Sequence, residues 1–404
     1  MITGLDNNAI RLSTAVLDGR TPKGYRPWMA DGPSMRDQPH RGSRHECRKG
    51  LRYGTNGVGS PSGIPRRAES RDGFRNTARG FSLVELMIAL VLGLLVIGAV
   101  VSVFITNQQA FRTAENMARL QENARFAFEA LAREMRESGG TPCGATAVAN
   151  VLNGGGGWWD WGNGPLIGYD GNQAGPLSFG GGPGQRVNGT DGVLVLTASL
   201  FEGVVITNHN ATAAQFTVNM ANHGIQDGDI VMACDSQSAA IFQVTNANQA
   251  NATIVHNTGT GAPGNCSKGL GLPTVCTANG TPKSFANGGL IAQYSASFWY
   301  IGNNPRGGRS LYRLGFTGAP SPQAQEIADG ITGMQIEYLT AAPGAPPALA
   351  SGYVAASAIA DWDDVVAARI TLTMETDDRV GINGNAILRP FMHVISLRNR
   401  EYVP

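Results

Sequence analysis

The sequence predicts an α+β fold, in which one long N-terminal α-helix packs on a mainly antiparallel β-sheet head. Residues 86–105 form an uncharged apolar run, and residues 106–138 continue with apolar side chains at three- and four-residue spacing. This continuation is typical of an amphipathic helix. From residue 192 onward the chain consists of short β-type runs between turn signals, which favours antiparallel sheet.

The apolar segment, residues 81–105, is expected to span a membrane. Leu86 to Ile105 is long enough as a helix to cross about 30 Å, the thickness of a bilayer core. A buried core helix is usually shorter and amphipathic. Basic residues mark the cytoplasmic side of a span, so the N-terminus should stay in the cytoplasm and the C-terminal part should cross. The arginines before the run are Arg66, Arg67, Arg71, Arg75 and Arg79.

Charge divides the chain at the start of this helix. Residues 1–80 contain 15 Lys and Arg against 7 Asp and Glu, whereas residues 81–404 contain 16 against 23. The overall charge of +1 therefore describes neither part. Residues 1–80 lack sustained periodicity, so we interpret them as a basic leader that is removed or partly not translated. Few aromatic residues accompany the arginines, which disfavours a nucleic-acid-binding arm.

Glu85 lies just inside the apolar run, where a carboxylate is costly to bury and needs a partner. The alternative is that Glu85 sits in the membrane interface. The segment from Gly80 through Phe81 to Glu85 and Leu86 resembles the class III signal of type IV prepilins. The resemblance implies cleavage between Gly80 and Phe81 by prepilin peptidase, N-methylation of Phe81, and a role for Glu85 in filament assembly. An 80-residue leader is long for that family and puts the start codon in doubt.

Residues 106–140 are expected to continue the same helix. Its apolar stripe should pack on the head, because the pattern is short for a coiled coil. Gly139, Gly140 and Pro142 predict its end. The stripe consists of Met117, Leu120, Ala124, Phe128, Leu131 and Met135.

Residues 141–404 are expected to form the β-rich head. Its first part is rich in glycine and should form loops. Trp158, Trp159 and Trp161 in this part either fill a core or form a binding surface. The expected strands are residues 192–199, 203–208, 214–220, 229–235, 240–245, 252–257, 291–301, 310–316, 331–340, 365–375 and 391–399.

Several segments resemble the PilW family of minor pilins. They are the helix end LQENARFAFEALAREMRESG, the runs GDIVMACDSQSAAIFQVT, SLYRLGF and ADGITGMQIEYL, and the pair DWDDVVAARITLTM and VISLRNR. The resemblance implies a non-enzymatic minor pilin that takes part in priming or tip assembly. Its implied partners are other minor and major pilins and the inner-membrane pilus assembly platform. The implied location is the inner membrane with a periplasmic head, then the pilus at the cell surface. A minor pseudopilin of a type II secretion system is the alternative.

The four cysteines after the leader favour two disulfides in an exported domain, with three connectivities open. Cys266 and Cys276 bracket a short loop, which favours that pair and leaves Cys143 with Cys234. A zinc site is disfavoured, because no CxxC occurs and no histidine has ligand spacing.

No catalytic residue, cofactor or metal is expected. The sequence contains no GxSxG, HExxH or Walker A motif. The histidines after the leader, which are scattered along the sequence, are His209, His223, His256 and His393.

Overall fold

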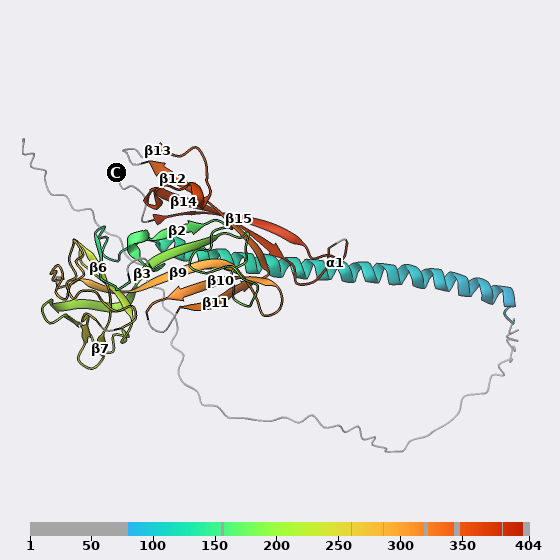
Figure 1. The fold of residues 1–404 in the computed structure, drawn as a ribbon. Helices are drawn as coiled ribbons and strands as arrows, with labels where there is room; N and C mark the ends of the chain where they lie inside the picture. The colour runs from blue at the N-terminus through green and yellow to red at the C-terminus, as the bar shows by residue number, and fades with distance from the viewer. Residues whose placement is uncertain are drawn as a thin grey trace, which may run out of the picture. The chain divides into compact units, whose positions relative to one another are not determined.

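The computed structural model describes residues 80–398, apart from residues 155–156, 260, 286, 319–321, 343–347 and 382. The basic leader expected over residues 1–80, including Cys47, therefore lies outside the described residues except for Gly80. The described part confirms the α+β fold: one long helix is followed by a head of mostly antiparallel strands (Figure 1).

Helix α1 runs without interruption from Leu83 to Glu137, 55 residues that span about 80 Å at 1.5 Å per residue. The predicted glycine stop is confirmed. Gly139 adopts a positive φ of 71°, which turns the chain out of the helix. The Gly139 N–H then bonds to the carbonyl of Leu196 at 3.1 Å, so the end of the helix is tied to the head.

The head contains an 11-stranded sheet and a four-stranded sheet. In the large sheet the main path is β1-β6-β5-β9-β3-β4-β8-β7, with β10 and β11 beyond β9 and β2 beside β3. Its strands are β1 (Val148–Asn150), β2 (Leu166–Tyr169), β3 (Gly192–Asn210), β4 (Gln215–Val218), β5 (Ile230–Cys234), β6 (Ala239–Gln243), β7 (Asn246–Asn248), β8 (Thr253–Val255), β9 (Leu290–Asn303), β10 (Arg309–Phe316) and β11 (Gln323–Asp329).

The four-stranded sheet has the order β13-β12-β14-β15. Gly330, at a φ of 72°, connects β11 of the large sheet directly to β12 of the small one. Among the described strand pairs, only β1 and β6 run parallel. The strands of the small sheet are β12 (Ile331–Ala342), β13 (Ala348–Leu349), β14 (Val365–Glu375) and β15 (Leu388–Ser396).

The C-terminal half of α1 supplies the centre of the main core. Its predicted stripe is buried from Leu120 to Met135 and shares one hydrophobic cluster with side chains from both sheets, such as Trp299 of β9 and Ile370 of β14. Figure 1 shows β11 and β15 beside this part of the helix. The helix therefore joins the two sheets of the head.

One charged residue of α1 strengthens this contact. The Glu134 carboxylate accepts a hydrogen bond from the Trp299 indole N–H at 2.7 Å and forms an ion pair with Arg313 of β10 at 2.7 Å. Both charged side chains are mostly shielded from solvent, so the contact fixes the helix against β9 and β10.

The glycine-rich stretch expected to form loops is organised around a buried arginine. The Arg186 guanidinium donates to the carbonyls of Gln173, Ala174 and Thr190 at 2.6–3.0 Å. Burial lowers the pKa of Arg186 to about 10, so the side chain is still cationic at neutral pH. Five N–H donors in a rigid plane suit a site lined with carbonyl groups.

A buried carboxylate links the two sheets. Asp191, just before β3, accepts a hydrogen bond from the N–H of Ile336 in β12 at 2.8 Å. Burial raises the pKa of Asp191 to about 6. Close packing supports the same junction, because a Cβ at Gly168 of β2 would overlap the ring of Tyr338 in β12.

Replacing Leu131 with Ala should lower the free energy of unfolding by about 3 kcal/mol, because its fully buried side chain lies between both sheets. Urea denaturation of the detergent-solubilised chain measures the change. Phe126→Ala, at an exposed position of the same helix, is the matched control and should change stability little. Equal effects of the two substitutions would contradict this packing.

Candidate functional site

The N-terminal end of α1 is accessible in the described chain. Gly80 and Phe81 precede the helix, Ser82 occupies the cap position, and the Leu86 N–H makes the first helical bond to the Ser82 carbonyl at 3.1 Å. The Phe81 side chain is 81% exposed. The expected cleavage position between Gly80 and Phe81 thus lies in extended chain just before the helix.

Glu85 lies in the first turn of α1 and is exposed. A carboxylate is favourable there, because unpaired N–H groups give a helix N-terminus partial positive charge. Phe81 and Glu85 are four residues apart, so the structure places both at the same end of the helix. Both residues are exposed in the described chain.

Helix α1 lies in two different environments. An 18-residue window of its N-terminal half has a mean hydropathy of 3.0 and none of it is buried. The C-terminal half is buried at intervals from Asn116 to Met135. Apolar side chains at this density are not stable against water, so the N-terminal half requires cover from a bilayer or from other subunits.

A loop between β14 and β15 contacts the helix where burial begins. The Asn116 amide donates to the Asp378 carboxylate at 3.1 Å, and the Thr113 hydroxyl donates to the Val380 carbonyl at 3.5 Å. We call residues 376–387 the β14–β15 loop. It fixes the helix at the point where the helix leaves the head.

The structure pairs the cysteines in the way that the spacing favours. Cys143, six residues after the end of α1, bonds to Cys234 at the end of β5, with 5.9 Å between the Cα atoms. Cys266 bonds to Cys276 across a separation of 10 residues, with a Cα distance of 4.9 Å. The first disulfide fastens the segment after the helix to the large sheet, and the second closes a surface loop.

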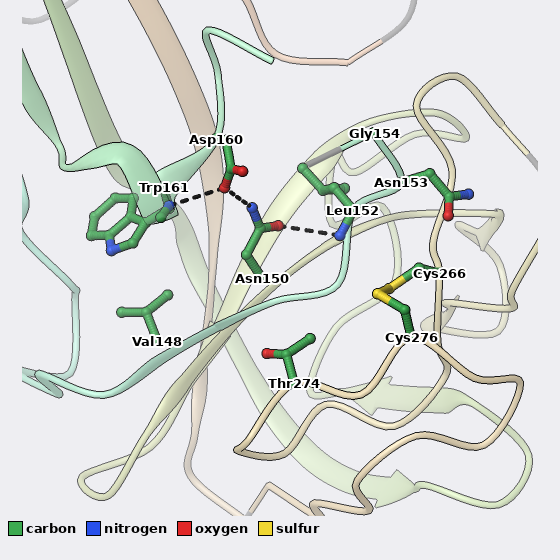
Figure 2. A pocket seen from close by; sticks show the side chains of 11 residues that line it. Val148, Asn150, Leu152, Asn153, Gly154, Asp160, Trp161, Cys266, Thr274 and Cys276 are labelled. Carbon is green, nitrogen blue, oxygen red and sulfur yellow. Dashed lines mark hydrogen bonds between the residues drawn. A yellow bond between two sulfur atoms is a disulfide. The ribbon is translucent and has the colours of Figure 1, made fainter. Parts of the chain in front are cut away.

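A hollow of about 550 Å³ lies beside the second disulfide (Figure 2). The Asp160 carboxylate accepts from the Asn150 amide at 2.7 Å and from the Gly162 N–H at 3.0 Å. The Asn150 oxygen in turn accepts from the Leu152 N–H at 3.2 Å. These side chains hold one another and the loop backbone, so they serve the local structure of the hollow.

The three neighbouring tryptophans pack against a hydrophobic cluster of the large sheet that includes Tyr294 and Phe316. Trp159 lies 4.8 Å from Phe316 between ring centroids, and Trp161 lies 6.2 Å from Tyr294. Trp158 contacts the Trp159 ring edge to face. The structure therefore favours the core interpretation of this group, with Trp161 also lining the hollow in Figure 2.

Two histidines that look scattered in the sequence meet in the structure. The Nε2 atoms of His209 and His256 lie 3.1 Å apart, and both side chains are buried. His209 Nδ1 accepts from the Phe285 N–H at 3.1 Å, which places the His209 proton on Nε2 as the donor to His256. Burial lowers the pKa of His209 to about 4 and that of His256 to about 3.

The histidine pair lies among aromatic side chains. Within the described residues, no group of three His, Cys, Asp or Glu side chains lies close enough to hold an ion. The His209 ring stacks on Phe216, and the His256 ring lies near Phe242. It is a neutral polar contact inside an apolar cluster.

Two family models match the chain. A model of the prokaryotic N-terminal methylation motif matches residues 75–101, which include Gly80, Phe81 and Glu85. A model of the type IV pilus-assembly protein W family, PilW, matches residues 298–386, from β9 into the β14–β15 loop. No curated protein matches the chain. No solved structure matches it either.

Removing the disulfide Cys143–Cys234 by double Ser substitution should cost about 4–5 kcal/mol of unfolding free energy, because it closes a loop of 91 residues. The same change at Cys266–Cys276, whose separation is 10 residues, should cost about 3 kcal/mol. Denaturation of the two double variants under identical conditions measures the difference. A larger loss at Cys266–Cys276 would contradict the loop-closure account.

The histidine pair should make the chain less stable in acid. Both pKa values lie below the ordinary value of about 6.5, so between pH 6.5 and 4 the unfolded chain binds protons that the folded chain does not. The unfolding free energy should therefore decrease as the pH is lowered through this window. Asp191, with its raised pKa, acts in the opposite direction over the same window.

The substitution His256→Gln isolates the contribution of the pair. Between pH 6.5 and 4, the slope of the unfolding free energy against pH should be smaller than in the parent chain, by an amount that corresponds to the uptake of about one proton on unfolding. Identical slopes for His256→Gln and the parent would show that the pair is not neutral in the folded state.

Proposed function

We propose that this chain, a type IV pilin of the PilW family, is a minor pilin that takes part in the priming or tip complex of pilus assembly. Prepilin peptidase cleaves between Gly80 and Phe81, and Phe81 is N-methylated. The apolar half of α1 holds the chain in the inner membrane with the head in the periplasm. The subunit then leaves the bilayer and enters the filament.

The observation that supports this proposal best is the division of α1. One continuous helix has a C-terminal half that the head covers and an N-terminal half that nothing in the described chain covers. A helix used only as a membrane anchor needs no rigid continuation into the head. A subunit that moves from the membrane into a filament needs an apolar half that its own head leaves uncovered. Lipid surrounds that half in the membrane, and the helices of other subunits surround it in the filament.

Glu85 and the new N-terminal amine of Phe81 supply the register of that bundle. After cleavage, the amine of one subunit can neutralise the Glu85 carboxylate of its neighbour. Desolvation offsets much of the attraction, so the pair contributes to specificity more than to net stability. A misplaced neighbour would leave a carboxylate buried without its partner, which costs several kcal/mol.

The edge of the small sheet supports a role in contacts between heads. Strand β15 ends the four-stranded sheet, and Met392 and Val394 at its centre are exposed apolar side chains. An apolar edge strand favours association with another chain. We propose that other minor pilins bind at this edge within the assembly complex.

Glu85→Val should leave cleavage and methylation intact but reduce incorporation into filaments at least about tenfold, because it removes the charge that sets the register. Immunoblots of sheared pili against membrane fractions measure incorporation. Glu122→Val, at an exposed position outside the apolar run, should behave like the parent. Normal incorporation of Glu85→Val would remove the proposed role of Glu85.

Deletion of the chain separates a pilus role from a secretion role. Loss of twitching motility with normal exoprotein release supports the minor pilin. Loss of exoprotein release with normal pili would instead identify a minor pseudopilin of a type II secretion system.

A further inference from the structure

A groove lies where α1 leaves the head. It has a volume of about 950 Å³. One wall is the segment of α1 from Thr106 to Thr113, and the other consists of described residues between Arg379 and Arg389, most of them in the β14–β15 loop. The two walls are fastened together by the contacts of Thr113 and Asn116 with the loop. The groove is therefore a fixed feature of the junction between helix and head.

The groove is positively charged on an otherwise acidic protein. Arg112, Arg379 and Arg389 line it, and all three are exposed. No Asp or Glu is among its described lining residues, although residues 81–404 contain 23 Asp and Glu against 16 Lys and Arg. Within the described chain, none of the three arginines forms an ion pair. The acidic neighbours Asp377 and Asp378 precede the groove in the loop, and Asp378 is bonded to Asn116.

The position of the groove along α1 places it next to the surface of a bilayer. The apolar run ends at Ile105, and the groove begins at the next residue. Arg112 is seven residues further on, about 10 Å along the helix. The headgroup region extends about 5–8 Å beyond each face of the hydrocarbon core. A helix that spans the membrane with Leu86–Ile105 thus holds the start of the groove at headgroup level. Arg112 lies just beyond that level, from where its long side chain can reach back to the phosphates.

Apolar side chains adjoin two of the arginines. Phe111 precedes Arg112 and is 70% exposed, and Leu388 precedes Arg389 and is 57% exposed. Exposed apolar groups beside cations are unfavourable in bulk water. They are favourable at an interface, where the apolar groups can reach the acyl boundary and the guanidinium groups can reach phosphate.

We propose that this groove binds the phosphate of an anionic phospholipid headgroup in the leaflet that faces the head. The inference rests on the proposed membrane-inserted pilin. Arginine donates in a planar fork that fits phosphate oxygens, and Gln109, Asn383 and Asn385 supply neutral groups around it. The lipid holds the head against the membrane until the subunit is extracted, when the contact is lost.

The test measures lipid retention by the full chain solubilised in detergent. Phosphatidylglycerol or phosphatidylcholine is added, and native mass spectrometry counts the lipids that stay bound. The groove variant is the double substitution R379Q/R389Q. The matched control, R125Q/R133Q, removes the same charge from exposed positions of α1 outside the groove.

The parent and R125Q/R133Q should retain phosphatidylglycerol in preference to phosphatidylcholine, and R379Q/R389Q should weaken that binding at least about tenfold. The urea midpoint of each variant verifies folding, and the single variant R389Q replaces the double one if the latter fails to fold. Equal retention by the parent and the groove variant would overturn the proposal. Displacement of the lipid by millimolar inorganic phosphate would overturn it in favour of a free-anion site.

Failure of the lipid site can be distinguished from failure of the proposed pilus role. Methylation of Phe81 and filament incorporation are measured on the same variants. A processed, assembling chain without lipid selectivity defeats only the headgroup site, whereas an unprocessed chain defeats the pilin assignment.

Discussion

The contact between the C-terminal half of α1 and the two sheets organises the whole molecule. The stripe from Leu120 to Met135 lies in one cluster with side chains of both sheets. Glu134 fixes the helix against β9 and β10 through its contacts with Trp299 and Arg313. Because the same helix continues unbroken toward its N-terminus, the head has no flexible linker to the apolar segment. A force applied to the apolar half is transmitted directly to the core of the head.

The loop-rich parts of the head are stabilised by further contacts outside the helix. The large sheet contains many short strands, and long connections separate them. The disulfide from Cys143 to Cys234, the buried Arg186 and the bond from Asp191 to Ile336 each tie such a connection to a strand or to its own backbone. Disulfides can serve this purpose in a domain that folds in an oxidising compartment.

Much of the fold follows from local sequence pattern, and the parts that do not follow have identifiable causes. The helix, its glycine stop and the apolar strands were predictable because periodicity is local. Strand β11 was not, because its sequence, QAQEIAD, lacks apolar alternation and the strand pairs, among the described strands, only with β10. The expected runs 203–208 and 192–199 form one strand, β3, since a bulge near Gly203 keeps the ladder continuous.

Local sequence pattern reveals a candidate site only where its residues are close together in the chain. Gly80, Phe81 and Glu85 are adjacent in sequence, so a motif reveals them. The histidine pair joins residues 47 apart, and the contact of Asn116 with Asp378 joins residues 262 apart. Arg112 is just as distant from Arg379 and Arg389. Only the tertiary structure brings these groups together.

The mass of the N-terminal peptide of the membrane-extracted chain tests the central claim most directly. We expect a chain that begins at Phe81, carries one added methyl group on its amine and retains the apolar half of α1. A chain that keeps residues before Phe81, or one cut after the apolar run near Ile105, would contradict it.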